Sequence, residues 1–510
     1  MQTTKAATRC ERMSCQTGIR SPSARPSICR AKSQDCGPRQ TAITQLRSQR
    51  IQKQAAMKRT GLQWLAISVL LISALSANAD TRPQYGGTLH ITTSMSTSSL
   101  DPAEMPDSVG ARNLVALIFD TLVIVDATGR PQSALAESWQ SVAGDRGVEF
   151  HLRRNVKFHD GNPLTTEIVV SSLRKANPAW NVTAGGDVVS IESAGAIPEL
   201  LQELSLSRNA IAKRDATGNP SGTGPFHIVD WQPGKRLVAA ANEDYWNGRP
   251  FVDEIDIDMG RTFRDQMNAL ESGRADLAEV APEQMHRAVS QRYELLRSSP
   301  IELIALKFAK EAASAQEKAS RDALRLSIER QSMHNVLLQG AGQPSASLLP
   351  TWMSGYGFVF STEPDRLRAQ QLRDQIPGVP SFTLGYDNND PLARLLAERV
   401  ALNAKETGLS VQLNASATEL RLVRIPLASC DPWSSLLVLN NQLGLPPIEA
   451  KAHSLDQLFA SEQSMLASGR IIPLFHLPLA YAAGTNLRDW TVMPGGKLNV
   501  TGAWLKSSQP

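Results

Sequence analysis

Apolar residues alternate between a two-residue spacing and a helical spacing along the chain after residue 80. Residues 88–93 and 148–152 alternate apolar and polar side chains, which predicts half-buried strands. Residues 109–124 predict a helix, and Thr165 predicts the N-cap of another helix that runs to about Lys175. The apolar face of the first helix would be formed by Val109, Leu114, Leu117, Ile118 and Leu122.

The same pattern of helix, glycine and strand recurs further along. Residues 263–272 predict an amphipathic helix that stops at Gly273, and residues 275–280 predict the strand that follows. The segment 222–226 (GTGPF) opens a pair of strands. A longer helix is predicted at residues 321–338. Its core positions would be Leu324, Ile328, Val336 and Leu337.

The clearest unit of the sequence covers residues 381–413. Residues 381–386 predict a strand, and Asp390 and Pro391 fit an N-cap followed by proline at the first helical position. Gly408 would end the helix, and residues 409–413 predict the next strand, so the segment is a βαβ unit with a parallel strand pair. Its helix would bury Leu392, Leu395, Leu396 and Val400.

A second helix and strand occupy residues 455–475, with Gly469 between them and the strand at 471–475. Alternating helices and strands predict a mixed α/β fold. The chain of 510 residues, with 42% hydrophobic and 20% charged residues, has ample apolar surface for a packed core.

The N-terminal part carries a secretion signal. Lys58 and Arg59 precede the apolar stretch 62–75, and residues 77–79 (Ala-Asn-Ala) form a small-x-small cleavage site, so residues 57–79 are predicted to be a signal peptide. The alternatives are a buried N-terminal helix or a membrane anchor, but the stretch is short for a membrane span. Asp80 follows the cleavage site in place of a cysteine, which argues against a lipid anchor.

Residues 1–56 precede this signal and contain eleven Lys and Arg against two Asp and Glu. They are either a basic nucleic-acid-binding arm or an extension upstream of the true start at Met57. We favour the second interpretation and expect residues 1–56 to be non-native or disordered. Without these eleven and two charges, and without Lys58 and Arg59, the formal charge changes from +4 to −7. An acidic exported protein does not indicate a nucleic-acid partner.

No catalytic, metal-binding or cofactor motif stands out in the mature part. Cys430 is the only cysteine after residue 80, so no disulfide within the chain is expected. No two histidines have the i, i+4 spacing of a metal site, and residues 222–224 are followed by Pro225 and a strand, whereas a phosphate loop leads into a helix. We therefore expect no enzyme activity, no cofactor and no resident metal.

Several motifs, in order, resemble the family 5 extracellular solute-binding proteins of ABC importers, the group of dipeptide-, oligopeptide- and nickel-binding proteins. The resemblance covers residues 85–360. It is carried by residues 119–123 (FDTLV), 135–139 (LAESW), 151–161 (HLRRNVKFHDG), 222–226 (GTGPF), 242–246 (NEDYW) and 270–276 (LESGRAD).

The resemblance implies a two-lobed periplasmic-binding-protein fold, type II-like and of cluster C, with a hinge and a cleft between the lobes. Lobe I would consist of residues 80–304 and 484–510, and lobe II of residues 305–483. Such a protein captures a small polar solute in the periplasm, here a peptide by preference, and delivers it to the permease subunits of the inner membrane. We expect it to be a monomer that binds no nucleic acid.

Two departures from the family pattern bear on the ligand. The stretch 178–222 is shorter than in the family. Peptide-binding members hold the peptide amine with a carboxylate just before an acidic-Pro pair, and the matching positions here, Ala428 and Ser429, carry none. A charge-assisted hydrogen bond is about twice as strong as a neutral one, so its loss argues against capture of a peptide amine in the family's manner. Whether Asp431, in the Asp-Pro pair itself, replaces that carboxylate stays open.

Polar and aromatic residues near predicted strand ends are the candidate ligand contacts, because ligands bind there in open α/β sheets. They are Ser96, Ser98, Thr223, Tyr386, Asn388, Asp431 and Trp433. Three alternatives remain: a binder of a metal complex such as nickel, a transcriptional regulator with a solute-binding-like sensor domain, and a hydrolase of exported peptides. The regulator would need a helix-turn-helix before residue 80, and the hydrolase an activated nucleophile.

Overall fold

A computed structural model describes residues 82–506, apart from residues 107, 127–128, 143–146, 193–196, 217, 428–430, 447 and 449–453. The predicted signal peptide and the segment before it lie outside the described residues. Within the described part, no helix is both long and apolar enough to cross a membrane.

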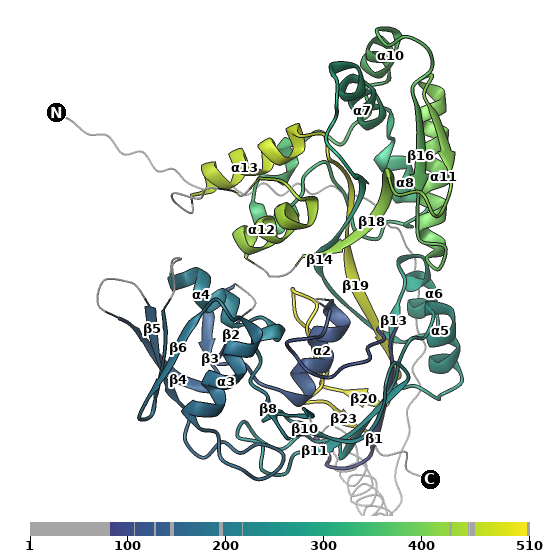
Figure 1. The fold of residues 1–510 in the computed structure, drawn as a ribbon. Helices are drawn as coiled ribbons and strands as arrows, with labels where there is room; N and C mark the ends of the chain where they lie inside the picture. The colour runs from purple at the N-terminus through teal and green to yellow at the C-terminus, as the bar shows by residue number, and fades with distance from the viewer. Residues whose placement is uncertain are drawn as a thin grey trace, which may run out of the picture. The chain divides into compact units, whose positions relative to one another are not determined.

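A large mixed sheet is the main structural element of the fold (Figure 1). Parallel pairing joins β1 to β12 and to β13, whereas β13, β19, β14 and β18 pair antiparallel in succession. The strands in spatial order are β10 (Phe226–Gln232), β11 (Arg236–Ala241), β12 (Glu254–Asp258), β1 (Thr88–Thr92), β13 (Leu277–Val280), β19 (Ile471–Ala483), β14 (Glu294–Phe308), β18 (Leu420–Pro426), β16 (Ser381–Gly385) and β17 (Ser410–Leu413), and β15 (Gln343–Pro344) pairs with β19.

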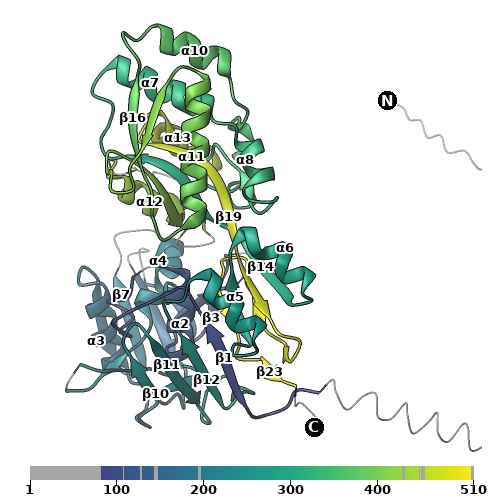
Figure 2. The ribbon, with the colours of Figure 1, turned by 90° about the vertical axis from the view of Figure 1, so that its right-hand side faces the viewer.

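Two long strands connect the two halves of this sheet. β14 and β19 pair from Glu294 opposite Ala483 to Lys307 opposite Ile471. The C-terminal end of β19 also pairs with β13, and the C-terminal end of β14 also pairs with β18. Each long strand therefore belongs to both halves, which Figures 1 and 2 show as a continuous ribbon between them.

A second, smaller sheet packs its own core in the first half of the chain. Its order is β4 (Ala136–Ser141), β5 (Gly147–Leu152), β7 (Val188–Glu192) and β6 (Asn181–Gly185), all antiparallel. Helices α3 (Thr166–Ala176) and α4 (Ile197–Leu204) contribute side chains to the same core. Phe150, Leu173 and Ile191 are fully buried in this cluster, so the apolar face of α3 closes the sheet.

Helices also surround the large sheet. In the half that contains β1 these are α2 (Val109–Ile118), α5 (Phe263–Glu271) and α6 (Met285–Ser290). In the other half they are α7 (Ala315–Ser327), α8 (Arg330–Val336), α9 (Thr351–Ser354), α10 (Arg366–Asp374), α11 (Pro391–Glu406), α12 (Pro432–Leu443) and α13 (Leu455–Ala467). The short strand pairs are β2 (Val123–Val125) with β3 (Pro131–Ser133), β8 (Lys213–Arg214) with β9 (Pro220–Ser221), β20 (Leu487–Arg488) with β23 (Trp504–Leu505), and β21 (Thr491–Val492) with β22 (Leu498–Asn499).

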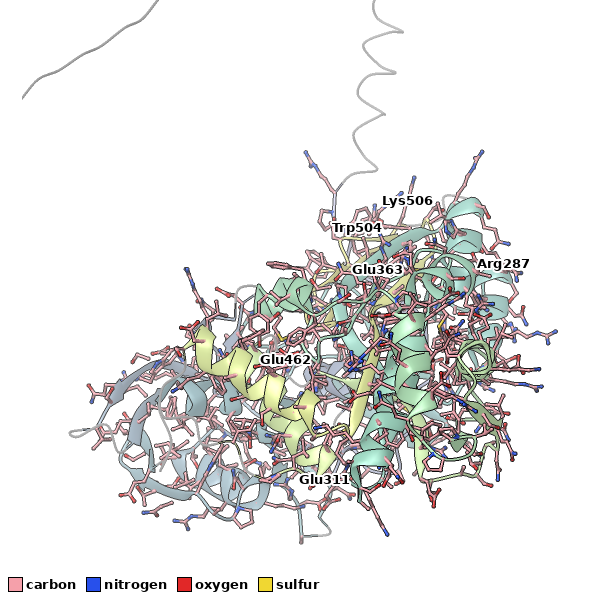
Figure 3. All side chains as sticks on the ribbon, turned by 90° about the horizontal axis from the view of Figure 1, so that it is seen from above. Arg287, Glu311, Glu363, Glu462, Trp504 and Lys506 are labelled. Atoms are coloured by element: carbon pink, nitrogen blue, oxygen red, sulfur yellow. The ribbon has the colours of Figure 1, made fainter. Side chains whose placement is uncertain are left out.

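Glu462 anchors α13 to the chain that precedes α9 (Figure 3). Its carboxylate is fully buried and accepts hydrogen bonds from Ser347 Oγ at 2.6 Å and from the backbone N–H of Leu349 at 3.2 Å. Burial raises the pKa of Glu462, and these donors offset part of the effect. Backbone and hydroxyl donors satisfy its Oε1, whereas its Oε2 is buried without a hydrogen-bond partner among the described residues.

The βαβ prediction is confirmed. β16 and β17 pair in parallel, and Asp390 caps α11 by accepting from the backbone N–H groups of Leu392 and Ala393. Gly408 ends the unit in the left-handed conformation. Leu392, Leu396 and Val400 are buried as expected, but Leu395 is wrong as a core residue, because it lies on the outer face with 46% of its surface exposed.

Three predicted element boundaries are wrong. The helix expected at 109–124 ends at Ile118, because the chain continues into β2. The helix expected at 321–338 breaks at Ile328, whose backbone is extended, and the buried guanidinium of Arg330 then donates to Pro473 O at 3.0 and 2.9 Å. This break leaves Val336 exposed. The strand expected at 471–475 runs on to Ala483.

Candidate functional site

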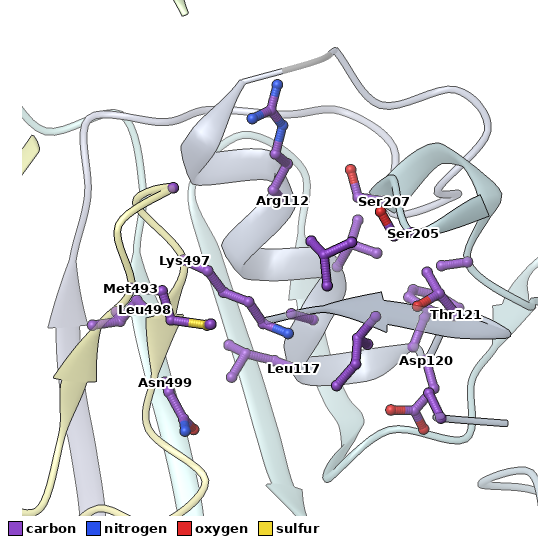
Figure 4. A pocket seen from close by; sticks show the side chains of 18 of the residues that line it. Arg112, Leu117, Asp120, Thr121, Ser205, Ser207, Met493, Lys497, Leu498 and Asn499 are labelled. Atoms are coloured by element: carbon purple, nitrogen blue, oxygen red, sulfur yellow. The ribbon is translucent and has the colours of Figure 1, made fainter. Parts of the chain in front are cut away.

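A cavity of about 390 Å³ opens beside α2 (Figure 4). Its wall comes from α2, from residues 205–207 and 245–247, and from the C-terminal segment 493–501. Ile301 from β14 and Leu427, which follows β18, also line it, so one of the two long strands and the segment after β18 reach the cavity. The volume lies at the lower end of the roughly 300–1,000 Å³ of small-molecule sites.

The wall is mostly apolar, with a few polar groups among apolar ones. The apolar part includes Val109, Val115, Leu117, Phe119, Leu206, Ile301, Leu427, Met493 and Val500. Hydroxyl and amide groups come from Thr121, Ser205, Ser207, Asn247 and Asn499. Four charged residues line the cavity: Arg112, Asp120, Asp126 and Lys497. An apolar wall with few convergent polar groups is the usual composition of a ligand site.

Asp120, which directly follows α2 and Phe119, is held by three donors. Thr223 Oγ1 and Trp246 Nε1 each donate to Asp120 Oδ2 at 2.9 Å, and the Tyr245 hydroxyl donates to Oδ1 at 3.1 Å. Burial raises the pKa of Asp120, the three hydrogen bonds offset part of the rise, and the positive charge of Lys497 offsets a little more. Asp120 therefore organises the wall of the cavity through Trp246 and Tyr245.

The glycine loop 222–224 brings Thr223 to Asp120. A Cβ on Gly222 would lie 1.8 Å from Ile118 O, and one on Gly224 would lie 2.6 Å from Ile118 C. Only glycine lets the loop approach the end of α2 this closely, and Gly224 N–H donates to Ile118 O at 3.0 Å. The loop therefore holds the C-terminal end of α2 against the start of β10.

Lys497 reaches the cavity from the hairpin formed by β21 and β22. Three hydrogen bonds, two within the backbone and one to a side chain, fix this hairpin. Met493 N–H donates to Lys497 O at 2.9 Å, Ser299 N–H donates to Pro494 O at 3.1 Å, and Leu498 N–H donates to Asn113 Oδ1 at 2.9 Å. The side chain extends from the hairpin toward α2 near Leu117 (Figure 4). The position of Lys497 is thus set by contacts to both β14 and α2.

No described residue forms an ion pair or hydrogen bond with the Lys497 ammonium group. A large part of its surface remains accessible, and Lys497 lines the cavity. Enclosure by the surrounding protein lowers the pKa of Lys497, and the charge of Asp120 opposes this effect. Lys497 is therefore a cation in the cavity wall with no carboxylate in contact.

Arg112 joins the cavity wall to the chain after β18. It lies on α2, and its Nη1 donates to Leu427 O at 3.1 Å. Leu427 directly precedes residues 428–430, where the amine-binding carboxylate was sought, and these three residues lie outside the described part. The contact connects the two halves of the large sheet at the cavity.

The seven residues predicted from the sequence lie apart from this cavity. Ser96 and Ser98 are exposed, and Ser96 Oγ donates to Gly234 O at 3.1 Å. Thr223 is fully buried behind the wall, where it donates to Asp120. None of the seven lines the cavity. Their roles as ligand contacts stay predictions.

The other four predicted residues belong to the half of the sheet that contains β16. Tyr386 packs partly buried against the core beside β16, and Asn388 is exposed in the loop before α11. Asp431 caps α12 by accepting from Ser434 N–H at 2.7 Å, and Trp433 is buried in the core with 6% of its surface exposed. The capping bond is a structural role for Asp431, and its replacement of the family carboxylate stays a prediction.

Sequence reasoning did not identify Arg112 or Lys497, and it named Asp120 and Trp246 only within the FDTLV and NEDYW motifs. Lys497 sits in a segment without strong periodicity, so its direction depends on the hairpin. Nothing in the local pattern around Arg112 distinguishes it from a solvated helical arginine. Among the described residues, no cluster of three or more His, Cys, Asp or Glu side chains could hold a metal ion.

Comparison with known proteins identifies the class. The family model of the bacterial extracellular solute-binding proteins, family 5 Middle, matches residues 130–425, which is more than half of the chain. The chain belongs to this family. The finding agrees with the large mixed sheet and with the cavity beside α2.

Two curated relatives illustrate the range of the family. The nickel-binding protein NikA of Staphylococcus aureus is 28% identical over 280 residues, which cover 51% of this chain and 55% of that protein. The probable D,D-dipeptide-binding periplasmic protein DdpA of Escherichia coli is 25% identical over 312 residues, which cover 56% of this chain and 60% of that protein. The matched part thus spans less than two thirds of either relative.

Solved structures show the same fold over most of the chain. NikA of Staphylococcus aureus in complex with Ni(L-His)2 superposes with a TM-score of 0.67 and 20% identity, over 82% of this chain and 99% of that one. A dipeptide-binding protein of Pseudoalteromonas sp. SM9913 in complex with Met-Leu gives a TM-score of 0.71 and 17% identity, over 82% of this chain and 100% of that one. The expected two-lobed α/β fold is confirmed.

Proposed function

We propose that this protein is the solute receptor of an ABC importer, which captures a small ligand and hands it unchanged to a membrane permease. The observation that carries the proposal is the cavity of about 390 Å³ in a chain of this family, lined by residues from both halves of the large sheet. Ligand that contacts both halves favours the closed arrangement, and this preference is what a receptor of this kind needs.

The strand pair β14 and β19 is the hinge in this proposal. We place lobe I at residues 80–304 and 484–510 and lobe II at residues 305–483, so one boundary falls within β14 and another directly after β19. Rotation about two paired strands moves the lobes as rigid bodies, because each lobe keeps its own hydrophobic clusters. Ile301 and Leu427 would then approach or leave α2 as the lobes move.

A short peptide is the ligand class that we favour. The sequence motifs and the relatives named for dipeptides support it. A metal chelate is the second candidate, supported by the match to NikA of Staphylococcus aureus, whose structure holds nickel with two histidine molecules. The cavity wall suits either ligand, since apolar groups surround a few polar ones.

Secretion to the periplasm without a lipid anchor, a monomeric state and delivery to inner-membrane permease subunits complete the proposal. They are supported by the predicted signal at residues 57–79, by Asp80 after the cleavage site and by the family's extracellular role. We propose no covalent chemistry and no resident cofactor.

The test starts from the full chain, expressed with its N-terminal segment and purified without denaturation. The protein is incubated with a mixture of short peptides, washed and analysed by native mass spectrometry, in parallel with a sample that contains Ni²⁺ and L-histidine. Recovery of intact peptides, or of nickel with two histidines, supports a receptor. New cleavage products would show a hydrolase, and a protein that retains no solute in either sample contradicts the proposal.

A further inference from the structure

We propose that the cavity recognises an anionic group of the ligand, with the Lys497 ammonium as its counter-ion and the apolar wall as the seat of the ligand's body. This inference rests on the proposed receptor function and adds the charge of the ligand to it. The ligand class is a small, largely apolar solute with one carboxylate.

The placement of Lys497 is the first argument. The hairpin that carries it is bonded to β14 through Ser299 and to α2 through Asn113, whose Nδ2 also donates to the Tyr481 hydroxyl at 3.0 Å. Gly496 adopts φ +80°, and a Cβ there would lie 2.7 Å from Ile301 Cδ1. The chain therefore packs closely against Ile301 at this point. The backbone that carries Lys497 is held in place by these contacts. Rigid support of this kind is what a specific contact requires.

The charge balance of the wall is the second argument. Asp120 already accepts from Thr223, Tyr245 and Trp246, and no contact joins it to Lys497. Asp126 at the rim is engaged in its own turn, where it accepts from Arg130 N–H and from Gln132 Nε2. Neither carboxylate thus contacts the ammonium group. Lys497 thus contributes a positive charge to the cavity wall that no protein carboxylate contacts, and a ligand anion could pair with it through a charge-assisted hydrogen bond.

The shape of the wall is the third argument. Apolar side chains of α2, of Leu206 and of the hairpin line the same cavity as Lys497, so an anion with an apolar body fits this wall. A hydrogen bond from a charged donor in such a surrounding is stronger than a neutral one and is more costly to lose. The C-terminal carboxylate of an apolar dipeptide has this chemistry, and so has the carboxylate of a chelating amino acid.

The experiment compares probes that differ only in charge. Isothermal titration calorimetry measures the binding of Met-Leu, of its C-terminal amide and of N-acetyl-Met-Leu to the full chain. We expect the amide to bind at least about tenfold more weakly than the free acid, because one charged hydrogen bond is lost. Acetylation of the amine should have a smaller effect. A further titration with Ni²⁺ and L-histidine tests whether the carboxylate comes from a chelate instead of a peptide.

Variants assign the discrimination to Lys497. Lys497→Met should bind the free acid and the amide about equally, whereas Lys497→Arg should keep the preference for the acid. Lys318→Met, on the exposed face of α7, is the matched control and should behave like the wild type. Melting temperatures confirm that all three variants fold, and the acid–amide comparison in the wild type requires no variant.

The outcomes separate this inference from the receptor proposal. If the wild type binds acid and amide equally, or if Lys497→Met keeps the discrimination, the anion site is overturned while the receptor function stands. If no peptide and no nickel complex binds to the wild type, and nothing co-purifies with it, both the anion site and the receptor function are contradicted.

Discussion

At the scale of single residues, the carboxylate of Asp101 shows how one buried charge fixes three separate segments. Lys175 Nζ lies 2.6 Å from its Oδ2, Arg214 Nη2 lies 2.6 Å from its Oδ1, and Ala103 N–H donates to it at 3.0 Å. Burial alone would raise the pKa of Asp101, but the hydrogen bonds from Arg214 and Lys175 lower it to about 2. The segment after β1 is thereby tied to the end of α3 and to β8.

This pKa predicts an acid-dependent stability. In the unfolded chain the carboxyl titrates near 3.8, so the folded state binds fewer protons between that pH and about 2. The contribution of Asp101 to stability is complete above about pH 4 and disappears as the pH falls through 2. The shift corresponds to about 2–3 kcal/mol. Urea unfolding of the wild type and of Asp101→Asn at pH 7 should differ by at least this amount, and the difference should shrink at pH 3.

Glu104 supplies the matched control, because it contacts the same Lys175 Nζ at 2.9 Å but is exposed to solvent. Glu104→Gln should change the free energy of unfolding little. A loss equal to that of Asp101→Asn would mean that burial is not what gives the Asp101 pairs their strength.

At the scale of elements, N-cap residues fix where the helices begin, and tight turns fix where they end. Asp390 caps α11 and also contacts Arg424 Nη1 at 2.9 Å, while Glu302 contacts Arg424 Nη2 at 2.5 Å. Burial alone would lower the pKa of Arg424, but the two carboxylates raise it well above its usual value. The cap therefore also bonds the βαβ unit to β14 and β18.

Replacement of Asp390 should accordingly lower the free energy of unfolding by more than the loss of an N-cap without further contacts. Asp365 caps α10 by accepting from Arg368 N–H at 2.9 Å, but it is exposed and makes no buried ion pair. We expect Asp365→Ala to lower the free energy of unfolding by about 1 kcal/mol. Asp390→Ala should lower it by about 2–4 kcal/mol, since it also leaves the partly buried Arg424 with one partner fewer. Equal losses in chemical denaturation would contradict this account.

The hairpin at Gly496 makes a second prediction for a single element. Gly496→Ala adds strain from the positive φ and a clash with Ile301, whereas Gly378→Ala has a similar φ of +76° with no atom within 4 Å of the new Cβ. A positive φ at alanine costs about 1–2 kcal/mol. Gly378→Ala should therefore lower the free energy of unfolding by this amount, and Gly496→Ala should lower it by more. Calorimetric titration should also show weaker ligand binding for Gly496→Ala alone, because the shifted hairpin displaces Lys497.

At the scale of the whole molecule, the continuous strands β14 and β19 join the cores of both halves. Melting one half would unpair part of each strand from the other half, so residues 82–506 should unfold cooperatively. Scanning calorimetry should therefore give one transition, and bound ligand at 100 times its Kd should add about 2.7 kcal/mol of stability. Two separated transitions would show that the halves are thermodynamically independent and that the long strands do not couple them.

Much of the fold followed from local pattern, as two elements illustrate. The βαβ unit was predictable because Asp390, Pro391 and Gly408 are strong local signals and the apolar stripe has one period. The break at Ile328 was not, since Ile328 and Leu324 continue a helical spacing. Distant bonds hold the chain at this break: Glu329 N–H donates to Asn403 Oδ1, and Arg330 donates to Pro473 O.

The candidate site was far less predictable. The sequence placed ligand contacts at strand ends, and the structure places the cavity beside α2, where Asp120 and Lys497 line one wall from positions 377 residues apart. No short-range pattern encodes that meeting. It results from the hairpin at β21 and β22 being bonded to α2, after the chain has passed through both halves of the sheet.

By itself, the sequence determined the α/β class, the family and the segments that cap, turn and alternate, because these depend on neighbours a few residues away. Tertiary structure alone decided which charges share a cavity, which helix breaks and which leucine faces solvent. Those outcomes depend on contacts between distant segments, and packing forms such contacts only once the long strands have brought the two halves together.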